Sequence, residues 1–199
     1  MRPLLLTALL FVGCTVPIAL PTPSDSDYVG SKGVDTLYPK QEAAEKIAAS
    51  DIPIDWQYFS LDEIELPLPS TAEHGTSADD CWWARSIPLD VIGDPAYFAF
   101  RLCKLPYKTS EAFLNTLCTK DEDIDPSLSG SSKGHSVYFD VMHNGVRILQ
   151  YSGNCQLAGA GSYLLEENGT VYRIVLSTDE QKAGKQNATI SFLNARPAR

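Results

Sequence analysis

Two Asn-Gly dipeptides, at residues 144–145 and 168–169, constrain the fold of this 199-residue chain more than any other feature of its sequence. Each dipeptide lies between runs of alternating apolar residues. A two-residue type I′ turn requires positive φ at both positions, and Asn followed by Gly adopts that conformation at low cost. The stretch from His135 to Leu176 therefore predicts two successive β-hairpins.

The two turns also predict the register of the strands. In the first hairpin Phe139 lies opposite Gln150, and in the second Leu165 lies opposite Tyr172. Side chains alternate between the two faces of a strand. One face of the first hairpin therefore carries Val137, Phe139, Val141, Val146 and Ile148. One face of the second carries Tyr163, Leu165, Tyr172, Ile174 and Leu176, and its opposite face carries Leu164, Glu166, Val171, Arg173 and Val175.

The last apolar run, from Ala188 to Leu193, has Ile190 and Phe192 in alternation and predicts a C-terminal strand. Together with the hairpins it makes an antiparallel sheet of about five strands. The expected fold class is therefore α+β, with this sheet packed against two or three short helices and cross-linked by disulfides.

The segments before the hairpins are less regular. Residues 39–50 and residues 109–118 each predict a short amphipathic helix with one apolar face. The apolar face of the first helix consists of Ala43, Ala44, Ile47 and Ala48. That of the second consists of Phe113, Leu114 and Leu117, and Ser110 can cap this helix. Residues 94–103 fit both a helix that begins at Asp94-Pro95 and a strand with alternating apolar residues. Residues 66–69 contain two prolines, which argue against a central strand, and residues 70–80 predict a surface loop.

The N-terminal segment determines the expected compartment. Residues 1–20 predict a secretory signal peptide, because the apolar run from Leu4 to Val12 is too short to span a bilayer. An alternative is a bacterial lipoprotein leader that ends at Cys14. Residues 21–38 predict a flexible tether, and residues 39–199 a single domain. We therefore expect a secreted, extracellular protein that is not attached to a membrane once the leader is removed.

Four cysteines remain after the leader, and in an exported chain they predict two disulfides. The sequence cannot choose among the three connectivities. We expect Cys103–Cys118 and Cys81–Cys155, because the short local loop is the easiest to close. No CxxC pair exists and the spacings fit no zinc pattern, so no metal site is expected.

Two sequons, Asn168-Gly169-Thr170 and Asn187-Ala188-Thr189, predict N-glycosylation at Asn168 and Asn187. The first lies on an expected hairpin tip and the second just before the expected C-terminal strand. The formal net charge of −9 argues against a nucleic-acid partner, because binding to a phosphate backbone depends on Lys and Arg.

The sequence offers weak candidates for chemistry. Asp121, Asp123 and Asp125 begin like an EF-hand, but Pro126 stands where glycine is required and Ser132 replaces the closing glutamate, so we interpret them as a solvated charge run. No GxSxG, HExxH, P-loop or Rossmann motif occurs, and no cofactor is expected.

The candidate catalytic residues are His135 and His143. They lie eight residues apart on one expected strand, about 26 Å at the rise of a strand, so they cannot act on one atom together. Either would need a carboxylate from elsewhere, and Arg147 is expected across the hairpin. The pair Trp82-Trp83 suggests a carbohydrate platform or base stacking, but core packing beside a disulfide is the better interpretation.

The segment from Gln150 to Gly159, with Asp80-Cys81 upstream, resembles the fungal secreted necrosis-inducing effector domain. That family carries an Asp-Cys before a helix and a Tyr-Gly-x-Cys-x-x-Gly stretch after a strand. Here Ser152 is inserted and the gap between the two motifs is longer. The whole chain is similar to small secreted, cysteine-containing effectors of plant-colonising fungi, which implies a role in virulence.

Three hypotheses for function follow. The favoured one is a non-enzymatic, monomeric, secreted effector that binds a host or cell-surface protein or polysaccharide. The alternative is a secreted hydrolase, ribonuclease-like in kind, in which His135 or His143 works with a carboxylate. A structural cell-wall component is the third, and it predicts retention in the wall fraction.

Overall fold

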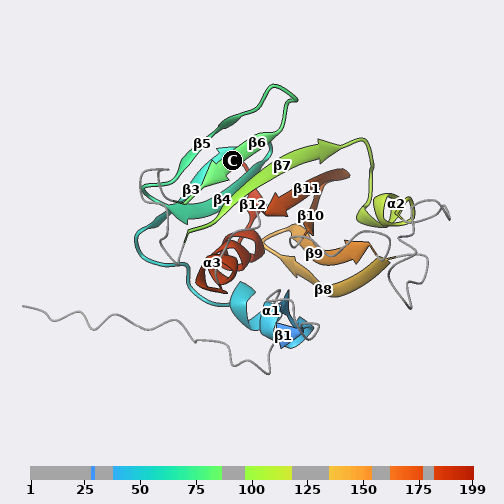
Figure 1. The fold of residues 1–199 in the computed structure, drawn as a ribbon, viewed down its shortest axis with the longest axis horizontal. Coiled ribbons are helices and arrows are strands. Elements are labelled where there is room, and N and C mark those ends of the chain that lie inside the picture. The colour runs from blue at the N-terminus through green and yellow to red at the C-terminus, as the bar shows by residue number, and fades with distance from the viewer. Residues whose placement is uncertain (1–27, 30–37, 87–96, 118–134, 154–161, 177–181) are drawn as a thin grey trace, which may run out of the picture.

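The structure is a computed structural model that describes residues 28–29, 38–86, 97–117, 135–153, 162–176 and 182–199 (Figure 1). Its helices are α1 (Gln41–Ala48), α2 (Ser110–Leu114) and α3 (Lys182–Leu193). Its strands are β1 (Tyr28–Val29), β2 (Tyr38–Pro39), β3 (Trp56–Leu61), β4 (Ile64–Pro69), β5 (Glu73–Thr76), β6 (Trp82–Arg85), β7 (Ala99–Leu105), β8 (His135–His143), β9 (Val146–Gly153), β10 (Ser162–Glu167), β11 (Thr170–Leu176) and β12 (Arg196–Pro197).

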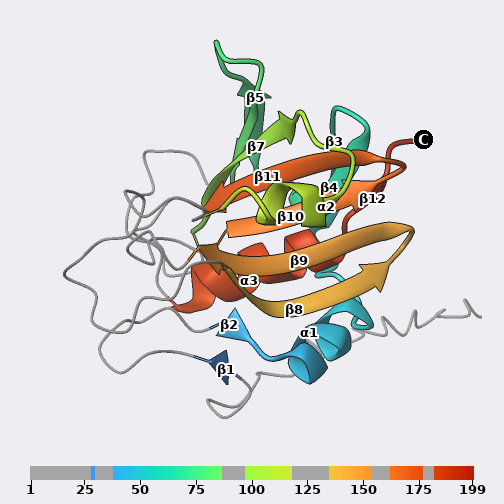
Figure 2. The same cartoon turned by 90° about the vertical axis from the view of Figure 1, so that its right-hand side faces the viewer.

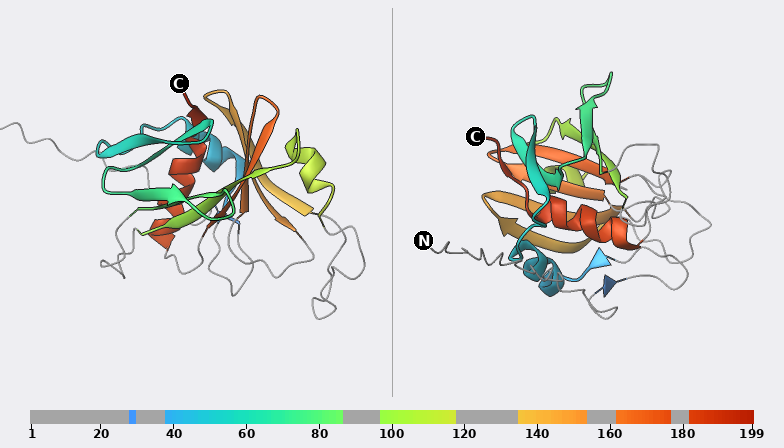
Figure 3. Two further views of the ribbon diagram at one scale, coloured as in Figure 1. Left: turned by 90° about the horizontal axis from the view of Figure 1, so that it is seen from above. Right: turned by 90° about the vertical axis from the view of Figure 1, so that its left-hand side faces the viewer.

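Seven antiparallel strands form the main sheet, in the order β5-β6-β7-β11-β10-β9-β8. A second sheet has the order β12-β4-β3, and β1 pairs with β2. Helix α3 lies on one side of the main sheet, which we call the inner face, and α2 lies on the opposite side, the outer face (Figures 2 and 3). The expected α+β class with antiparallel pairing is confirmed, but the main sheet is larger than the five strands expected.

Both predicted hairpins are present with the predicted register. Asn144 and Gly145 have φ of 50° and 84°, and Asn168 and Gly169 have φ of 47° and 74°. These four positive values identify two type I′ turns. The cross-strand pairs are also those expected, including Phe139 with Gln150, Val141 with Ile148, Leu165 with Tyr172 and Tyr163 with Ile174.

The prediction that Val137 faces the core is wrong. The register between β8 and β9 shifts between Val137 and Phe139. Such a bulge breaks the alternation of side chains between the two faces. Val137 is consequently 42% exposed, whereas Phe139 is 1% exposed, as expected.

The expected C-terminal strand from Ala188 to Leu193 is also wrong, because these residues form the end of α3. Residues four apart lie on one face of a helix. Ala188 and Phe192 are four apart and both fully buried, whereas Ile190 is only half-buried. The alternation of Ile190 and Phe192 therefore has no structural role, and the apolar helix face covers the main sheet instead.

Three other segments differ from expectation or decide an open alternative. Residues 94–103 include the first part of β7, whose Phe100 and Leu102 are buried, so the strand alternative holds for the described part. Within the expected loop at 70–80, β5 forms the edge of the main sheet. Strand β4 is central despite its prolines, because β12 pairs only with Ile64 and Glu65 and the prolines lie beyond it.

The expected disulfide pairing is wrong as well. Cys81 is bonded to Cys103, with the two Cα atoms 4.4 Å apart. Strands β6 and β7 pair so that Trp82 lies opposite Leu102, which places the two cysteines opposite each other. Cys118 and Cys155 lie outside the described residues, as do Asp121, Asp123 and Asp125.

Both predicted N-terminal helices are present, though shorter than expected. In α1 the alanines 43, 44 and 48 are buried. The Gln41 side-chain amide donates to the carbonyl of Asp140 on β8 at 2.9 Å, and the Asp140 N–H donates back to Gln41 Oε1 at 2.8 Å. Helix α2 is capped by Thr109 rather than by Ser110, since Thr109 Oγ1 accepts the Ala112 N–H at 3.2 Å.

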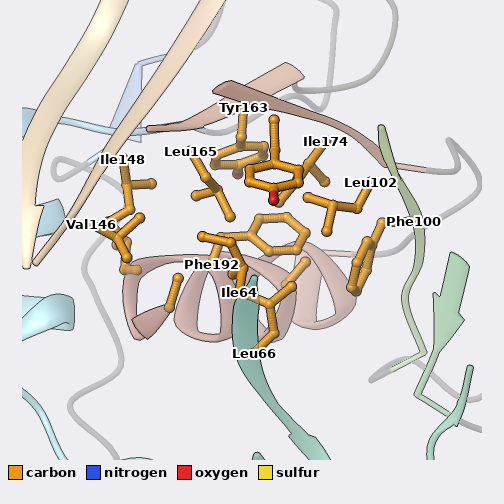
Figure 4. Packing of buried hydrophobic residues seen from close by; sticks show 14 of the residues in the cluster. Ile64, Leu66, Phe100, Leu102, Val146, Ile148, Tyr163, Leu165, Ile174 and Phe192 are labelled. Carbon is orange, nitrogen blue, oxygen red and sulfur yellow. The ribbon is translucent and has the colours of Figure 1, made fainter. Parts of the chain in front are cut away.

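The main core lies between the inner face, α3 and the small sheet (Figure 4). Phe192 packs edge-on against Tyr163 and Phe100, with ring centroids 4.8 Å and 5.0 Å apart. The Tyr172 hydroxyl donates to Asp62 in the β3–β4 turn at 2.7 Å, which ties the small sheet to the main one. Burial and this carboxylate together hold the pKa of Tyr172 well above its ordinary value.

Candidate functional site

The outer face of the main sheet has an apolar half and a polar half. Helix α2 packs over the apolar half, where Phe113 and Leu114 meet a second apolar cluster that contains Leu149, Tyr151, Leu164 and Val171. Away from this cluster, strands β6, β7 and β11 present polar and aromatic side chains. The candidate functional site is built on these strands and extends onto β10 and β9.

A row of directly paired residues crosses five strands of the outer face. It comprises Trp83 on β6, Arg101 on β7, Val175 on β11, Ser162 on β10 and Tyr151 on β9. We call it the outer row. Its ends are four interstrand spacings apart, or about 19 Å at about 4.8 Å per strand. Its sequence neighbours, among them Ala84, Leu102, Ile174 and Tyr163, all point to the inner core.

Trp83 is fixed at one end of this row. It is paired with Gly75 on β5, and its indole lies so close that a Cβ at Gly75 would stand 2.9 Å from the ring. The Arg85 guanidinium carbon lies 5.6 Å from the ring centre. Arg85 in turn donates through Nε to Glu73 at 2.7 Å. The half-buried indole is therefore held in place by its neighbours on β5 and β6.

Arg101 lies next in the row and has a carboxylate partner. Its guanidinium forms an ion pair with Asp79 in the β5–β6 turn, and both side chains are more than half exposed. Hydrogen bonds from Ser77 and Arg101 hold the pKa of Asp79 below its ordinary value. Because Arg101 is exposed, its pairing with Asp79 can be exchanged for a ligand at low cost.

Arg173 lies beside the row, on β11 between Cys103 and Leu164. Among the arginines of the main-sheet strands, Arg85, Arg101 and Arg147 each pair with a carboxylate. In the part of the chain that the structure describes, Arg173 has no such partner, and its buried Nε has no hydrogen-bond partner either. A half-buried guanidinium without a counter-charge is costly. Its side chain contacts the hydroxyl of Tyr151 instead.

Tyr151 lies at the other end of the row, at the margin of the apolar half, where its ring packs edge-on against Phe113 of α2 with ring centroids 5.8 Å apart. Its side chain is 5% exposed. Burial raises the pKa of Tyr151, and the charge of Arg173 together with hydrogen bonds from Ser162 and Arg173 partly offsets that effect. Tyr151 and Arg173 stand on the two strands that flank β10, offset by two residues. With Ser162 between them, three hydrogen-bond donors gather in one place.

The two histidines predicted as catalytic candidates are not brought together. His135 begins β8 and His143 ends it, so they stand at opposite ends of one strand. No ion pair joins either of them to a carboxylate within the residues described. Arg147, expected near them, pairs instead with Asp140 through two bonds of 2.9 Å and 2.6 Å and with Glu111.

The two sequons lie in different environments. Asn168 is exposed at the tip of the β10–β11 turn, where a glycan would meet solvent. Asn187 lies within α3 rather than before a strand, and it is half-buried. The hydroxyl of its sequon residue Thr189 is 3.0 Å from the Tyr163 hydroxyl and donates to the Lys185 carbonyl at 2.9 Å. The expectation of a strand after Asn187 is therefore wrong.

The residues of the candidate site were missed by sequence reasoning. Core packing beside the disulfide holds for Trp82, which packs on the inner core, but Trp83 points to the outer face. Alternation along a strand predicts that two successive tryptophans point to opposite faces. The same alternation places Arg173 on the face of its hairpin opposite Tyr172 and Ile174. Nothing in the sequence could show that it lacks a carboxylate partner among the described residues.

The comparisons with known proteins give no family for the chain: no family model matches it, and no curated protein does either. Among the described residues, no group of three or more His, Cys, Asp or Glu side chains is placed to hold a metal ion. The same residues include no helix that is long and apolar enough to cross a membrane. The geometry of the outer row therefore carries the functional argument.

Proposed function

We propose that this chain is a secreted, effector-like protein that acts by binding a host or cell-surface target through the outer row. Trp, Tyr and Arg are the residues that most often dominate binding energies at interfaces. The outer row places Trp83 directly beside Arg101, whose side chain is more than half exposed. This juxtaposition is the observation that carries the proposal.

Export of the chain is part of the same proposal. The predicted leader at residues 1–20, the predicted tether at residues 21–38 and the exposed sequon at Asn168 support it. The Cys81–Cys103 disulfide also supports it, because disulfides persist in oxidising compartments. The resemblance to small secreted fungal effectors suggests that the target belongs to a colonised host. These features motivate the search for partners outside the producing cell.

The proposal is tested by binding of the secreted, disulfide-bonded protein to intact host cells and isolated walls. We expect Trp83→Ala and Arg101→Gln together to reduce binding at least tenfold, because they remove two anchors of the row. Arg199→Gln is the matched control, since it removes one exposed charge at the C-terminus, away from the row. Equal binding by both variants would contradict the proposal.

A second assay addresses the hydrolase alternative. The purified protein is incubated with RNA and with cell-wall polysaccharides, and product formation is followed together with that of His135→Ala and His143→Ala. Under the binding proposal no substrate is cleaved. Cleavage that is lost on either histidine substitution would replace binding with catalysis as the function.

A further inference from the structure

Strand β3 is the outermost strand of the small sheet, and its far edge carries backbone groups that do not pair with β4. Tyr58 on this strand lies opposite Pro67 of β4. Two residues earlier, Trp56 lies opposite Pro69. Proline has no N–H, so neither pair can be one of the hydrogen-bonded pairs that alternate along an antiparallel ladder. The backbone groups of Trp56, Tyr58 and Ser60 therefore point away from β4.

Most of these outward groups have no partner. The Trp56 N–H is used within the chain, because it donates to the Pro53 carbonyl at 3.0 Å. At Tyr58 and Ser60, no described residue forms a hydrogen bond with the outward N–H or C=O. The strand also contains no proline, no charged residue and no shift of register, which are the usual means of protecting a sheet edge. Such an edge can accept an extended segment as a further strand.

The turn that precedes β3 adds an apolar contact beside this edge. Ile54 is fully exposed, in the turn that the hydrogen bond between Trp56 and Pro53 closes. Gly, Pro, Asn, Asp and Ser dominate such turns, whereas an exposed isoleucine contributes nothing to the core. A segment that pairs with β3 and continues past Trp56 reaches Ile54 and can bury it.

The charges at the two ends of β3 indicate which kind of segment fits. Asp55 precedes the strand, and Asp62 and Glu63 follow it in the β3–β4 turn. Lys104 lies 3.6 Å from Asp62 and 3.5 Å from Glu63. Asp55 forms no ion pair with any described residue. With three carboxylates and one ammonium, this edge is complementary to a segment that carries Lys or Arg at its ends.

A second copy of this chain is a poor occupant of the edge. The free groups of two β3 strands would pair if Tyr58 of one copy lay opposite Ser60 of the other. In that register Asp55 lies opposite Glu63 of the second copy, and like charges in such positions destabilise a strand pair.

We propose that the free edge of β3 binds an extended, basic segment of a partner protein. The backbone of this segment pairs with Tyr58 and Ser60, and its Lys or Arg side chains lie near the carboxylates at both ends of the strand. The surface belongs to the small sheet and is separate from the outer row. The inference therefore goes beyond the proposed function and does not depend on it.

The experiment uses the secreted, disulfide-bonded protein and synthetic peptides with capped ends. The peptide KKTVTVTKK joins a strand-forming centre to basic ends, and EETVTVTEE is its acidic match. The basic peptide should shift the NMR signals of the Tyr58 and Ser60 amides and slow their hydrogen exchange, because both N–H groups gain an acceptor. The acidic peptide should bind at least tenfold more weakly, and added salt should weaken binding of the basic peptide.

Two changes separate strand pairing from attraction between charges. Ser60→Pro removes an N–H that points away from β4, so it should weaken binding at least tenfold while the β3–β4 pairing stays in place. Ser60→Ala keeps that N–H and is the matched control, which should bind as the wild type does. The basic peptide with every Thr and Val N-methylated keeps its charges but loses its central donors, so it should not bind. This peptide tests the pairing even if Ser60→Pro does not fold.

Three results would overturn the inference. Amide shifts confined to β5 or β8, or binding that survives N-methylation of the peptide, would show that β3 does not accept the segment. Equal binding of the acidic and basic peptides would contradict the choice of a basic partner. Sedimentation that shows a dimer of the free protein, lost in Ser60→Pro, would make a second copy the occupant.

One further variant keeps this test apart from that of the proposed function. Trp83→Ala with Arg101→Gln should bind the basic peptide as the wild type does, because both residues lie on the outer face of the main sheet. Loss of peptide binding in this variant, with the fold intact, would contradict the separation of the two surfaces.

Discussion

Removal of the Cys81–Cys103 disulfide should destabilise the protein by about 3 kcal/mol. The bond closes a loop with a sequence separation of 22 residues. In the chain-entropy model a loop of that length lowers the entropy of the unfolded chain by about 11 cal/mol/K, or about 3.4 kcal/mol at 25 °C. This is a large part of the 5–15 kcal/mol by which domains are usually stable.

The variant that tests this value replaces both cysteines, Cys81→Ala and Cys103→Ala. Alanine avoids a free thiol, and at Cys81, which is 6% exposed, it also avoids burying a hydroxyl. Urea unfolding followed by circular dichroism should show a midpoint lower by about 1.5 M, for a slope of about 2–3 kcal/mol/M. A reductant should destabilise the wild type at least as much as the double substitution does.

Two results would refute this reasoning. One is a loss of less than about 1 kcal/mol, which would mean that the loop is already constrained in the unfolded chain. The other is peptide mapping by mass spectrometry that finds Cys81 joined to a cysteine other than Cys103. Mapping of the wild type should also find Cys118 joined to Cys155, because these are the cysteines that remain if the mature chain has two disulfides.

Three other substitutions test contacts of the fold. Arg147→Gln should lower the free energy of unfolding by about 1–2 kcal/mol at neutral pH. Because Arg147 lowers the pKa of Glu111, the stability of the wild type should fall as the pH drops below about 4.3. In acid denaturation the variant should lose less stability over the same pH range than the wild type does. Tyr172→Phe should lower the free energy of unfolding by about 1–2 kcal/mol, because the hydrogen bond to Asp62 is lost. Since the fold raises the pKa of Tyr172, the stability of the wild type should decline as the pH rises above about 10. Unfolding experiments at high pH should show a smaller decline for the variant. Gly75→Ala should cost about 1–3 kcal/mol, because the new methyl displaces the indole of Trp83, and tryptophan fluorescence of the folded variant should shift.

The sequence predicts the hairpins because their determinants are local. Each Asn-Gly turn requires only that two adjacent residues adopt positive φ, and the turn then determines every pair along both strands. The positions of Phe139 and Tyr172 follow from this alone. A bulge has no comparable local signal here, so the orientation of Val137 could not be predicted.

Non-local features could not be predicted for a physical reason. The residues from Ala188 to Leu193 suit both a strand and a helix, and α3 forms because the sheet offers a surface to its apolar face. The disulfide partner of Cys81 depends on the pairing of β6 with β7, which no residue near Cys81 encodes. For the candidate site, alternation could have indicated the direction of Trp83. That Arg173 has no carboxylate partner among the described residues emerges only from the arrangement of the strands.

The Gln41 side chain has a consequence for self-association of this protein. A strand at the border of a sheet presents free N–H and C=O groups, and these can recruit a strand from another molecule. At Asp140 both groups are already hydrogen-bonded to the side-chain amide of Gln41, so they are not free to pair with a strand of another molecule. The bulge after Val137 bends the same border further along. These two features protect the free edge of β8 against edge-to-edge association and fibril growth, although β8 is the outermost strand of a wide antiparallel sheet.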